Sequence, residues 1–146
     1  MKTHITTVEK ERNLGVFTHL GTFLGFLFPL ATFLVPLIIW LSNKDSKFVS
    51  DHSKSALNFQ ISMLLYHVVL LIAGIIYLIN DIPYIDEFIE QISDNGFDLE
   101  FIVFLIVLFG IIFILATLSI VFTITAAIKA SKGNSYVYPM SIKFIS

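Results

Sequence analysis

Three long stretches of the chain contain no aspartate, glutamate, lysine or arginine, and no other feature limits its fold as strongly. They cover residues 13–43, 55–80 and 101–128, which are 31, 26 and 28 residues long. A helix needs about 20 apolar residues to cross a hydrocarbon core about 30 Å thick, so each stretch is long enough to span a bilayer. We therefore predict an all-α integral membrane protein, a helical bundle built as a single polytopic domain over residues 1–146.

The composition excludes several other classes of protein. Only 14% of the residues are charged, against about 25% in soluble domains, which excludes a soluble enzyme and a disordered chain. The net charge is −2, and this balance offers no basic patch to a nucleic acid. The chain has no cysteine, which excludes disulfide bonds, a thiolate nucleophile and a cysteine-ligated metal.

Two prolines, Pro29 and Pro36, interrupt the first charge-free stretch. Proline inside a helix removes a hydrogen bond and clashes with the preceding turn, and broken helices persist in a bilayer only where protein covers the freed groups. One interpretation is a single long, kinked helix that crosses the membrane. The other is a pair of short helices, at about 14–28 and 30–42, that meet near Pro29 and enter and leave on the same side.

The distribution of basic residues favours the pair of short helices. The nine lysines and arginines fall before residue 13, between residues 44 and 54, and after residue 128; the loop at 81–100 has none and carries seven of the eleven acids. Basic residues concentrate on the cytoplasmic side of membrane proteins, and a re-entrant first pair places all nine there. We therefore predict a cell-membrane protein with both termini cytoplasmic and the acidic loop 81–100 outside.

The other two stretches predict long helices at about 50–80 and 99–131, the first of them capped by Ser50 or Asp51. Polar side chains gather on two faces of the first long helix, and small side chains form a stripe on the second. The first face holds His52, Ser55, Asn58, Ser62 and Tyr66, the second holds Gln60, His67 and Gly74, and the small stripe is Ala116, Ser119, Thr123, Ala127 and Ala130. Polar faces are costly against lipid, so we expect both to point into the bundle or toward a partner. Small stripes allow backbones to approach closely, so we expect this stripe to pack against the first pair of helices or against the polar face of the first long helix.

Three segments carry a family resemblance. They are Pro-Leu-Ile-Ile-Trp at 36–40, Asp-His-x-Lys-x-Ala-Leu-Asn-Phe-Gln at 51–60, and Gly-Asn-Ser-Tyr-Val-Tyr-Pro at 133–139. In these segments the chain resembles a family of small bacterial membrane proteins of unknown function. That family is distantly grouped with the twenty-kilodalton component of the chloroplast inner-envelope protein translocon, the Tic complex. The resemblance implies a compact domain of four helical segments and no reaction, and it links the chain to translocation by analogy alone.

The motif at 51–60 and the tail supply the candidate site residues. We expect Gly133 to end the last helix and Pro139 to fix an extended exit, so that the tail folds back over the motif. The amides of Asn58 and Gln60 would then meet the hydroxyls of the two tail tyrosines. On this hypothesis the motif is chiefly structural, and any ligand site lies beneath the closure. The candidates are His52, Lys54, Asn58, Gln60, Tyr136, Tyr138 and Pro139.

Histidines inside the apolar stretches are the candidates for cofactor binding. His19 and His67 are ionisable residues at membrane depth, where a function is the default hypothesis, and a bis-histidine haem needs two facing imidazoles. Their depths differ, about 7 Å against about 16 Å from the cytoplasmic ends of their segments, which disfavours this pair. The alternative is neutral histidines hydrogen-bonded to neighbouring helices. Zinc needs three or four converging ligands, and only Asp51, His52 and His19 form a cluster, so we expect no metal, cofactor or catalytic residue.

These features favour a non-enzymatic multi-pass membrane protein. It would be an accessory, scaffold or transport- or translocation-related component that contacts the lipid bilayer, a second copy of itself or other membrane proteins, and no nucleic acid. The alternative is a membrane redox protein that binds haem or quinone through His19, His52 or His67. A protective protein of the immunity or stress type is a third interpretation, which the sequence does not separate from the first.

Overall fold

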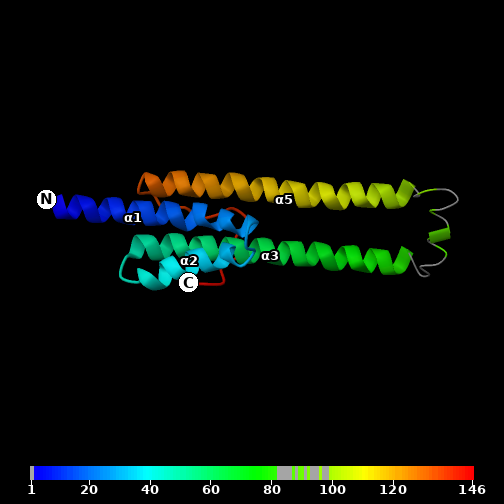
Figure 1. Ribbon diagram of the computed structural model, residues 1–146, viewed down its shortest axis with the longest axis horizontal. Helices are drawn as coiled ribbons and strands as arrows, with labels where there is room; N and C mark the ends of the chain where they lie inside the picture. Colours follow the sequence, from blue (N-terminus) through cyan, green and yellow to red (C-terminus); the bar gives the residue numbers. More distant parts are fainter. Residues whose placement is uncertain (1, 82–86, 88, 91, 93–95, 97–98) are drawn as a thin grey trace. The chain divides into compact units, whose positions relative to one another are not determined.

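The computed structural model describes residues 2–81, 87, 89–90, 92, 96 and 99–146, and the regular elements in these ranges are helices (Figure 1). They are α1 (Lys2–Leu20), the 3-10 helix η1 (Gly21–Phe26), α2 (Ala31–Ser42), α3 (Lys47–Asp81) and α5 (Leu99–Ser131). Both α3 and α5 are long and apolar enough to cross a membrane, and only 17% and 6% of their most apolar windows are buried. Such exposure differs from that of a core helix in a soluble protein. The predicted all-α fold, with two short segments and two long helices, is confirmed, while most of the loop 81–100 lies outside the described residues.

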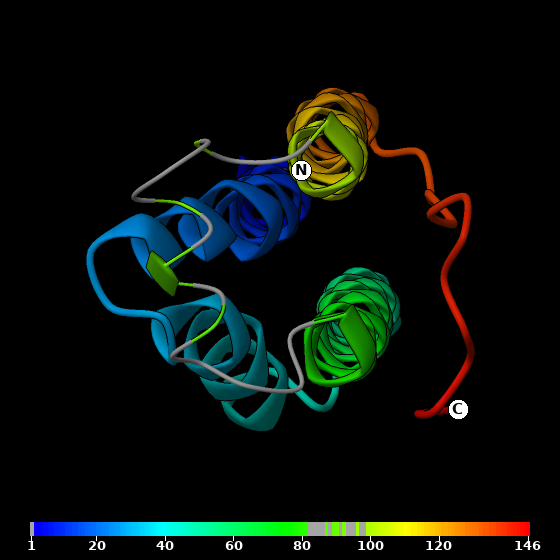
Figure 2. The same ribbon diagram turned by 90° about the vertical axis from the view of Figure 1, so that its right-hand side faces the viewer.

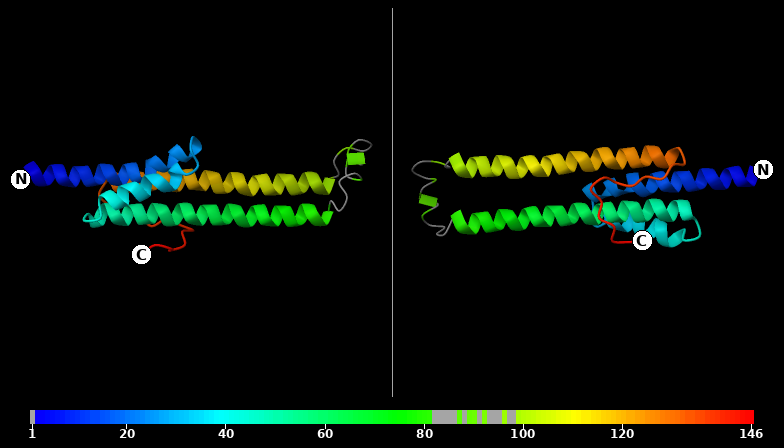
Figure 3. Two further views of the ribbon diagram at one scale, coloured as in Figure 1. Left: turned by 60° about the horizontal axis from the view of Figure 1, so that its bottom comes forward. Right: turned by 180° about the vertical axis from the view of Figure 1, so that it is seen from behind.

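The first charge-free stretch breaks at Pro29. After η1 the turn is held by the Leu24 carbonyl, which accepts the N–H of Phe28 at 2.9 Å. α2 then returns along η1 (Figure 3). The two segments approach so closely that a Cβ at Gly21 would overlap Val35 Cγ1. We call α1, η1 and α2 together the N-terminal hairpin.

Two helix starts differ from the prediction. α1 begins at Lys2 instead of near residue 14, because the polar residues ahead of the apolar stretch include good helix formers and continue the same helix. α3 also begins earlier, and its cap is Ser46, whose Oγ accepts the Val49 N–H at 3.3 Å. The predicted caps, Ser50 and Asp51, lie inside the helix. The preceding turn places a serine directly at the helix start, where its hydroxyl is a preferred cap.

Contacts divide the chain into two compact units, Met1–Met63 with Leu118–Ser146, and Leu64–Thr117. The second unit contains parts of α3 and α5, which pack through an aromatic pair. Tyr77 and Phe104 are stacked with ring centroids 3.9 Å apart. Most other large apolar side chains on the described parts of these two helices are exposed, as expected of helices that face lipid.

The first unit contains the candidate site residues. It combines the N-terminal hairpin, the first turns of α3, the last turns of α5 and the tail, which lies on the opposite side of α3 and α5 from α1 and α2 (Figure 2). α1 packs on both long helices at Gly15, where a Cβ would lie 3.0 Å from Phe48 Cε1 and 3.3 Å from Ala130 Cβ. The predicted packing of the small stripe is therefore confirmed at its C-terminal end, where Ala127 and Ala130 are buried, whereas Ala116 is exposed.

A glycine in the left-handed conformation ends α5, as predicted. Gly133 has φ +75°, its N–H donates to the Ala130 carbonyl at 2.9 Å, and the Asn134 N–H donates to the Lys129 carbonyl at 3.0 Å. This pattern is the Schellman motif. The Arg12 guanidinium lies against the glycine, since a Cβ there would lie 2.9 Å from Arg12 Nε, and its charge suits the negative end of the helix dipole.

Candidate functional site

The side chain of Tyr138 lies at the centre of the first unit. It is 2% exposed, its ring stacks on Phe59 of α3 with centroids 4.1 Å apart, and its hydroxyl lies 2.9 Å from His19 Nδ1 of α1. The side chain of Thr123 of α5 lies beside the same hydroxyl and opposes the rise in the pKa of Tyr138. One side chain of the tail therefore joins α1, α3 and α5.

Two buried histidines continue this chain of contacts. His19 Nε2 lies 2.7 Å from His52 Nδ1, and both side chains are almost completely buried. A hydrogen bond places one proton between two facing nitrogens, so the two rings cannot both be protonated there. One assignment that satisfies both contacts has Tyr138 donating to His19 Nδ1 and His19 Nε2–H donating to His52 Nδ1. This arrangement matches the expectation of histidines hydrogen-bonded to neighbouring helices.

The far nitrogen of His52 has no such contact. Within the described part of the chain, His52 Nε2 is buried without a hydrogen-bond partner, although the backbone of Asn134 approaches the ring. The Asp51 carboxylate points elsewhere and accepts a hydrogen bond from Lys47 at 2.7 Å. The cluster of Asp51, His52 and His19 considered for zinc is therefore not assembled, and the described residues contain no group of three metal-binding side chains.

The amide of Asn58 holds the end of the tail. Its Oδ1 accepts the N–H groups of Phe144 at 3.0 Å and Ile145 at 2.8 Å, and its Nδ2 donates to the Ile145 carbonyl at 2.9 Å. One turn further along α3, Ser62 Oγ accepts the Ile142 N–H at 2.8 Å. All of these hydrogen bonds are made with backbone groups of the tail. They hold the tail over the part of α3 that carries the motif, as expected from the sequence.

Lys54 and Ser55 fix the tail at two further points. Ser55 Oγ donates to the Tyr136 carbonyl at 2.9 Å, and Lys54 Nζ donates to the backbone oxygen of Ser146 at 2.8 Å. Lys54 Nζ also lies 5.4 Å from the centre of the Trp40 ring, a cation–π contact. Lys54 therefore connects α2, α3 and the tail.

The expected pairing of the two motif amides with tyrosine hydroxyls is wrong. Asn58 bonds to peptide groups of the tail, because an amide offers both a donor and an acceptor that match a peptide. The Tyr138 hydroxyl contacts His19 Nδ1 instead of the Asn58 amide. Gln60 is half-buried, and among the described residues its amide forms no hydrogen bond with the tail.

Pro139 also departs from its predicted role, since it starts a turn instead of an extended exit. The Ser141 N–H donates back to the Tyr138 carbonyl at 3.4 Å, and Met140 has φ +62°. Proline suits the second position of such a turn, while the third position requires positive φ and usually holds glycine. The turn redirects the tail so that its last residues run along α3.

Sequence reasoning missed the contact between Tyr138 and His19, and Thr123 as their neighbour. Tyr138 and His19 stand 119 positions apart, and helical periodicity does not reveal such a pairing. The available signal was the need of a buried histidine for a hydrogen-bond partner.

Burial determines the protonation state of the central hydroxyl. Removal from water raises the pKa of Tyr138, and the side chain of Thr123 opposes this rise without cancelling it. Desolvation disfavours the charged phenolate. Tyr138 therefore stays neutral, and its hydroxyl remains able to donate a hydrogen bond to His19.

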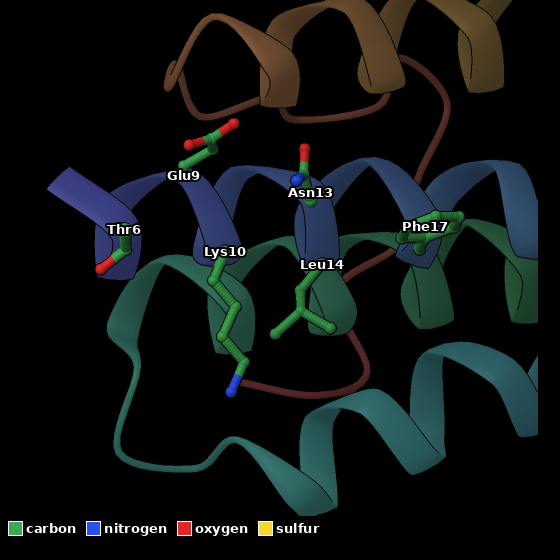
Figure 4. Close-up of a pocket in the computed structure, with 6 residues that line it drawn as sticks. All are labelled: Thr6, Glu9, Lys10, Asn13, Leu14 and Phe17. Carbon is green, nitrogen blue, oxygen red and sulfur yellow. The ribbon is translucent and has the colours of Figure 1, made fainter. Parts of the chain in front are cut away.

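A hollow of about 400 Å³ lies along the surface of α1 (Figure 4). It is lined by Thr6, Glu9, Lys10, Asn13, Leu14 and Phe17. Glu9 and Asn13 point to one side of the helix, and Lys10 and Leu14 to the other. All six except Leu14 are exposed, so the hollow is open and does not enclose a substrate.

The comparison with known proteins covers this whole arrangement. Residues 10–145 match the magnetosome magnetite crystal formation protein family, MamF/MmsF. The chain belongs to this family. The MamF/MmsF match includes the N-terminal hairpin from residue 10 onward, both long helices and the tail to residue 145, so the contacts of Tyr138, His19 and Asn58 fall within it. No curated protein and no solved structure matches the chain.

The resemblance to a small bacterial family is thereby confirmed at the level of MamF/MmsF. The comparisons give no support for the distant Tic relation, which stays a prediction.

Proposed function

We propose that this member of the MamF/MmsF family is a non-enzymatic accessory protein of a membrane, and that its folded polar end is a fixed surface for other components. A catalytic site needs groups aimed at a reacting atom. Tyr138, His19 and Asn58 are instead bonded to groups of the same chain. The hydrogen bonding of these three side chains within the chain is the observation that supports the proposal.

The family description suggests the process. MamF/MmsF is a magnetosome magnetite crystal formation family, and we extend crystal formation to this chain as its proposed context. The role that we assign to the chain there is structural, through its membrane segments and its closed polar end.

We further propose that the N-terminal hairpin is re-entrant and that both termini are cytoplasmic. α2 has 12 residues, which at 1.5 Å per residue gives about 18 Å, well short of a core about 30 Å thick. The start of α1 and the end of α2 lie toward the same end of the hairpin (Figure 1). This arrangement supports one cytoplasmic side for the basic residues around residues 2–12 and 44–54.

Deletion of the gene in its native host, followed by electron microscopy of membrane-bounded crystals, tests the process. Complementation with His52→Gln and Lys54→Met tests the absence of catalysis, because both remove ionisable groups. We expect each variant to restore crystal number and size in proportion to the amount of folded protein. A deletion without effect on crystals would contradict the proposed process. A variant that folds and accumulates normally but fails to complement would identify a working site.

The haem or quinone alternative finds little support in the site. Both nitrogens of His19 are engaged, and the 2.7 Å separation from His52 leaves no room for a metal, since a metal–imidazole bond is itself about 2 Å long. His67 belongs to the other compact unit. A visible absorbance spectrum of the protein purified from native membranes tests this alternative, and a Soret band would reverse our conclusion.

A further inference from the structure

The tip of the N-terminal hairpin exposes large apolar side chains. Four of them are more than 70% exposed: Phe26 (78%), Leu27 (73%), Phe28 (72%) and Leu30 (71%). The tip projects away from α1 and α2 (Figure 3). No charged residue occurs between Arg12 and Lys44 in the sequence. A contiguous apolar surface of this kind marks an interaction site, and the absence of charge fits lipid acyl chains.

The depth of the hairpin limits which lipids it meets. With both ends of the hairpin on one side, the length of α2, about 18 Å, brings the tip just past the middle of a core about 30 Å thick. α3 and α5 are long enough to pass through both leaflets. The hairpin therefore adds cross-sectional area to one leaflet and almost none to the other.

We propose that the N-terminal hairpin is a one-leaflet hydrophobic insertion, and that it makes the chain prefer membranes in which this leaflet is convex. The inference rests on the re-entrant topology proposed above. A convex leaflet has a larger area than the opposite leaflet and so accommodates the area that the hairpin adds, and apolar insertions into one leaflet are sensitive to curvature. Phe26 and Phe28 add large side chains to this insertion at its tip.

The test is sorting of the full chain between giant vesicles and thin tubes pulled from them. An impermeant dye on Ser46→Cys reports molecules whose turn between α2 and α3, at residues 43–46, faces outward. The same dye on Asn95→Cys reports molecules in the opposite orientation. We expect the tube-to-vesicle density ratio to exceed one for the first population and to fall below one for the second. The same ratio in both populations would overturn the proposal.

A matched pair of variants locates the effect in the hairpin. Phe26→Ala/Phe28→Ala removes tip volume, whereas Phe109→Ala/Phe113→Ala removes comparable volume from α5, where the two side chains are 63% and 73% exposed. The hairpin variant should move both ratios toward one, and the α5 variant should leave them unchanged. Equal behaviour of the two variants would contradict a role for the hairpin.

A third label separates failure of this inference from failure of the topology. Thr6→Cys should be accessible on the same side as Ser46→Cys. Access from opposite sides would overturn the re-entrant topology. Access from the same side without orientation-dependent sorting would leave the topology standing and overturn the curvature preference alone.

Discussion

Tyr138 carries a hydroxyl into a packed unit, where a polar group costs free energy unless it is hydrogen-bonded. His19 Nδ1 lies 2.9 Å from the hydroxyl, Thr123 lies beside it, and Phe59 covers the ring. The hydroxyl keeps its hydrogen bond to His19 only while the tail and α1 are both in place, so one residue couples the two elements.

The raised pKa of Tyr138 gives this contact a pH dependence. Its folded-state pKa lies above the unfolded value of about 10, so its contribution is complete below pH 10 and is lost above it, by up to about 1.4 kcal/mol per pH unit. Tyr138→Phe should lower the free energy of unfolding by about 1–2 kcal/mol near neutral pH, and the difference from wild type should shrink as the pH rises above 10. Unfolding curves of both proteins in detergent, recorded from neutral pH to above pH 10, measure this difference in stability. A stability difference that does not change with pH would contradict a buried neutral phenol.

Asn58 and Gln60 form a matched pair on one helix. Asn58 makes three hydrogen bonds to the tail, and at about 0.6 kcal/mol each in membrane proteins Asn58→Leu should cost about 2 kcal/mol. Gln60→Leu should leave stability almost unchanged. Unfolding in detergent measures the stability of each variant, and the rate at which a protease removes the tail measures how firmly the tail is held. Equal effects of the two substitutions would show that Asn58 does not hold the tail.

At the scale of elements, the end of α5 decides where the tail goes. Gly133→Ala meets both a positive φ and the Arg12 side chain, and should destabilise the fold by about 1 kcal/mol or more. Gly110→Ala is the control, because a Cβ at Gly110 meets nothing within 4 Å and alanine is the better helix former by about 0.5–1 kcal/mol. Thermal unfolding of the two variants should therefore shift in opposite directions, and shifts of the same sign and size would contradict this account of the helix end.

The elements also show how far sequence reasoning reaches. The long helices follow from uninterrupted apolar stretches, the break follows from Pro29, and the end of α5 follows from Gly133, because each depends on local chemistry. The cap at Ser46 was missed because Ser50 and Asp51 offer the same chemistry one turn later. The sequence predicted that the tail folds back over the motif, but not which groups hold it there. Its contacts with Asn58 are made by backbone groups, and these are the same in every residue type.

At the scale of the whole molecule, charge asymmetry and the hairpin lead to one topology. In intact cells, Asn95→Cys should react with an impermeant thiol reagent, whereas Thr6→Cys and Ser46→Cys should be protected until the membrane is opened. The reason is the separation of all nine basic residues from the acidic loop. Reaction of Ser46→Cys without Asn95→Cys would invert the orientation. Reaction of Thr6→Cys together with Asn95→Cys, while Ser46→Cys stays protected, would show that the first stretch crosses once.

The central claim is that the polar motif closes one end of the protein through the contact between the tail and α1. A double-mutant cycle between His19→Leu and Tyr138→Phe, measured by unfolding in detergent, tests it most directly. Residues in contact typically couple by 0.5–3 kcal/mol, and we predict a value of about 1 kcal/mol for this pair. The cycle between Asn58→Leu and Tyr138→Phe should give markedly weaker coupling, because the two side chains bond to different partners. Strict additivity for His19 and Tyr138 would contradict the closure.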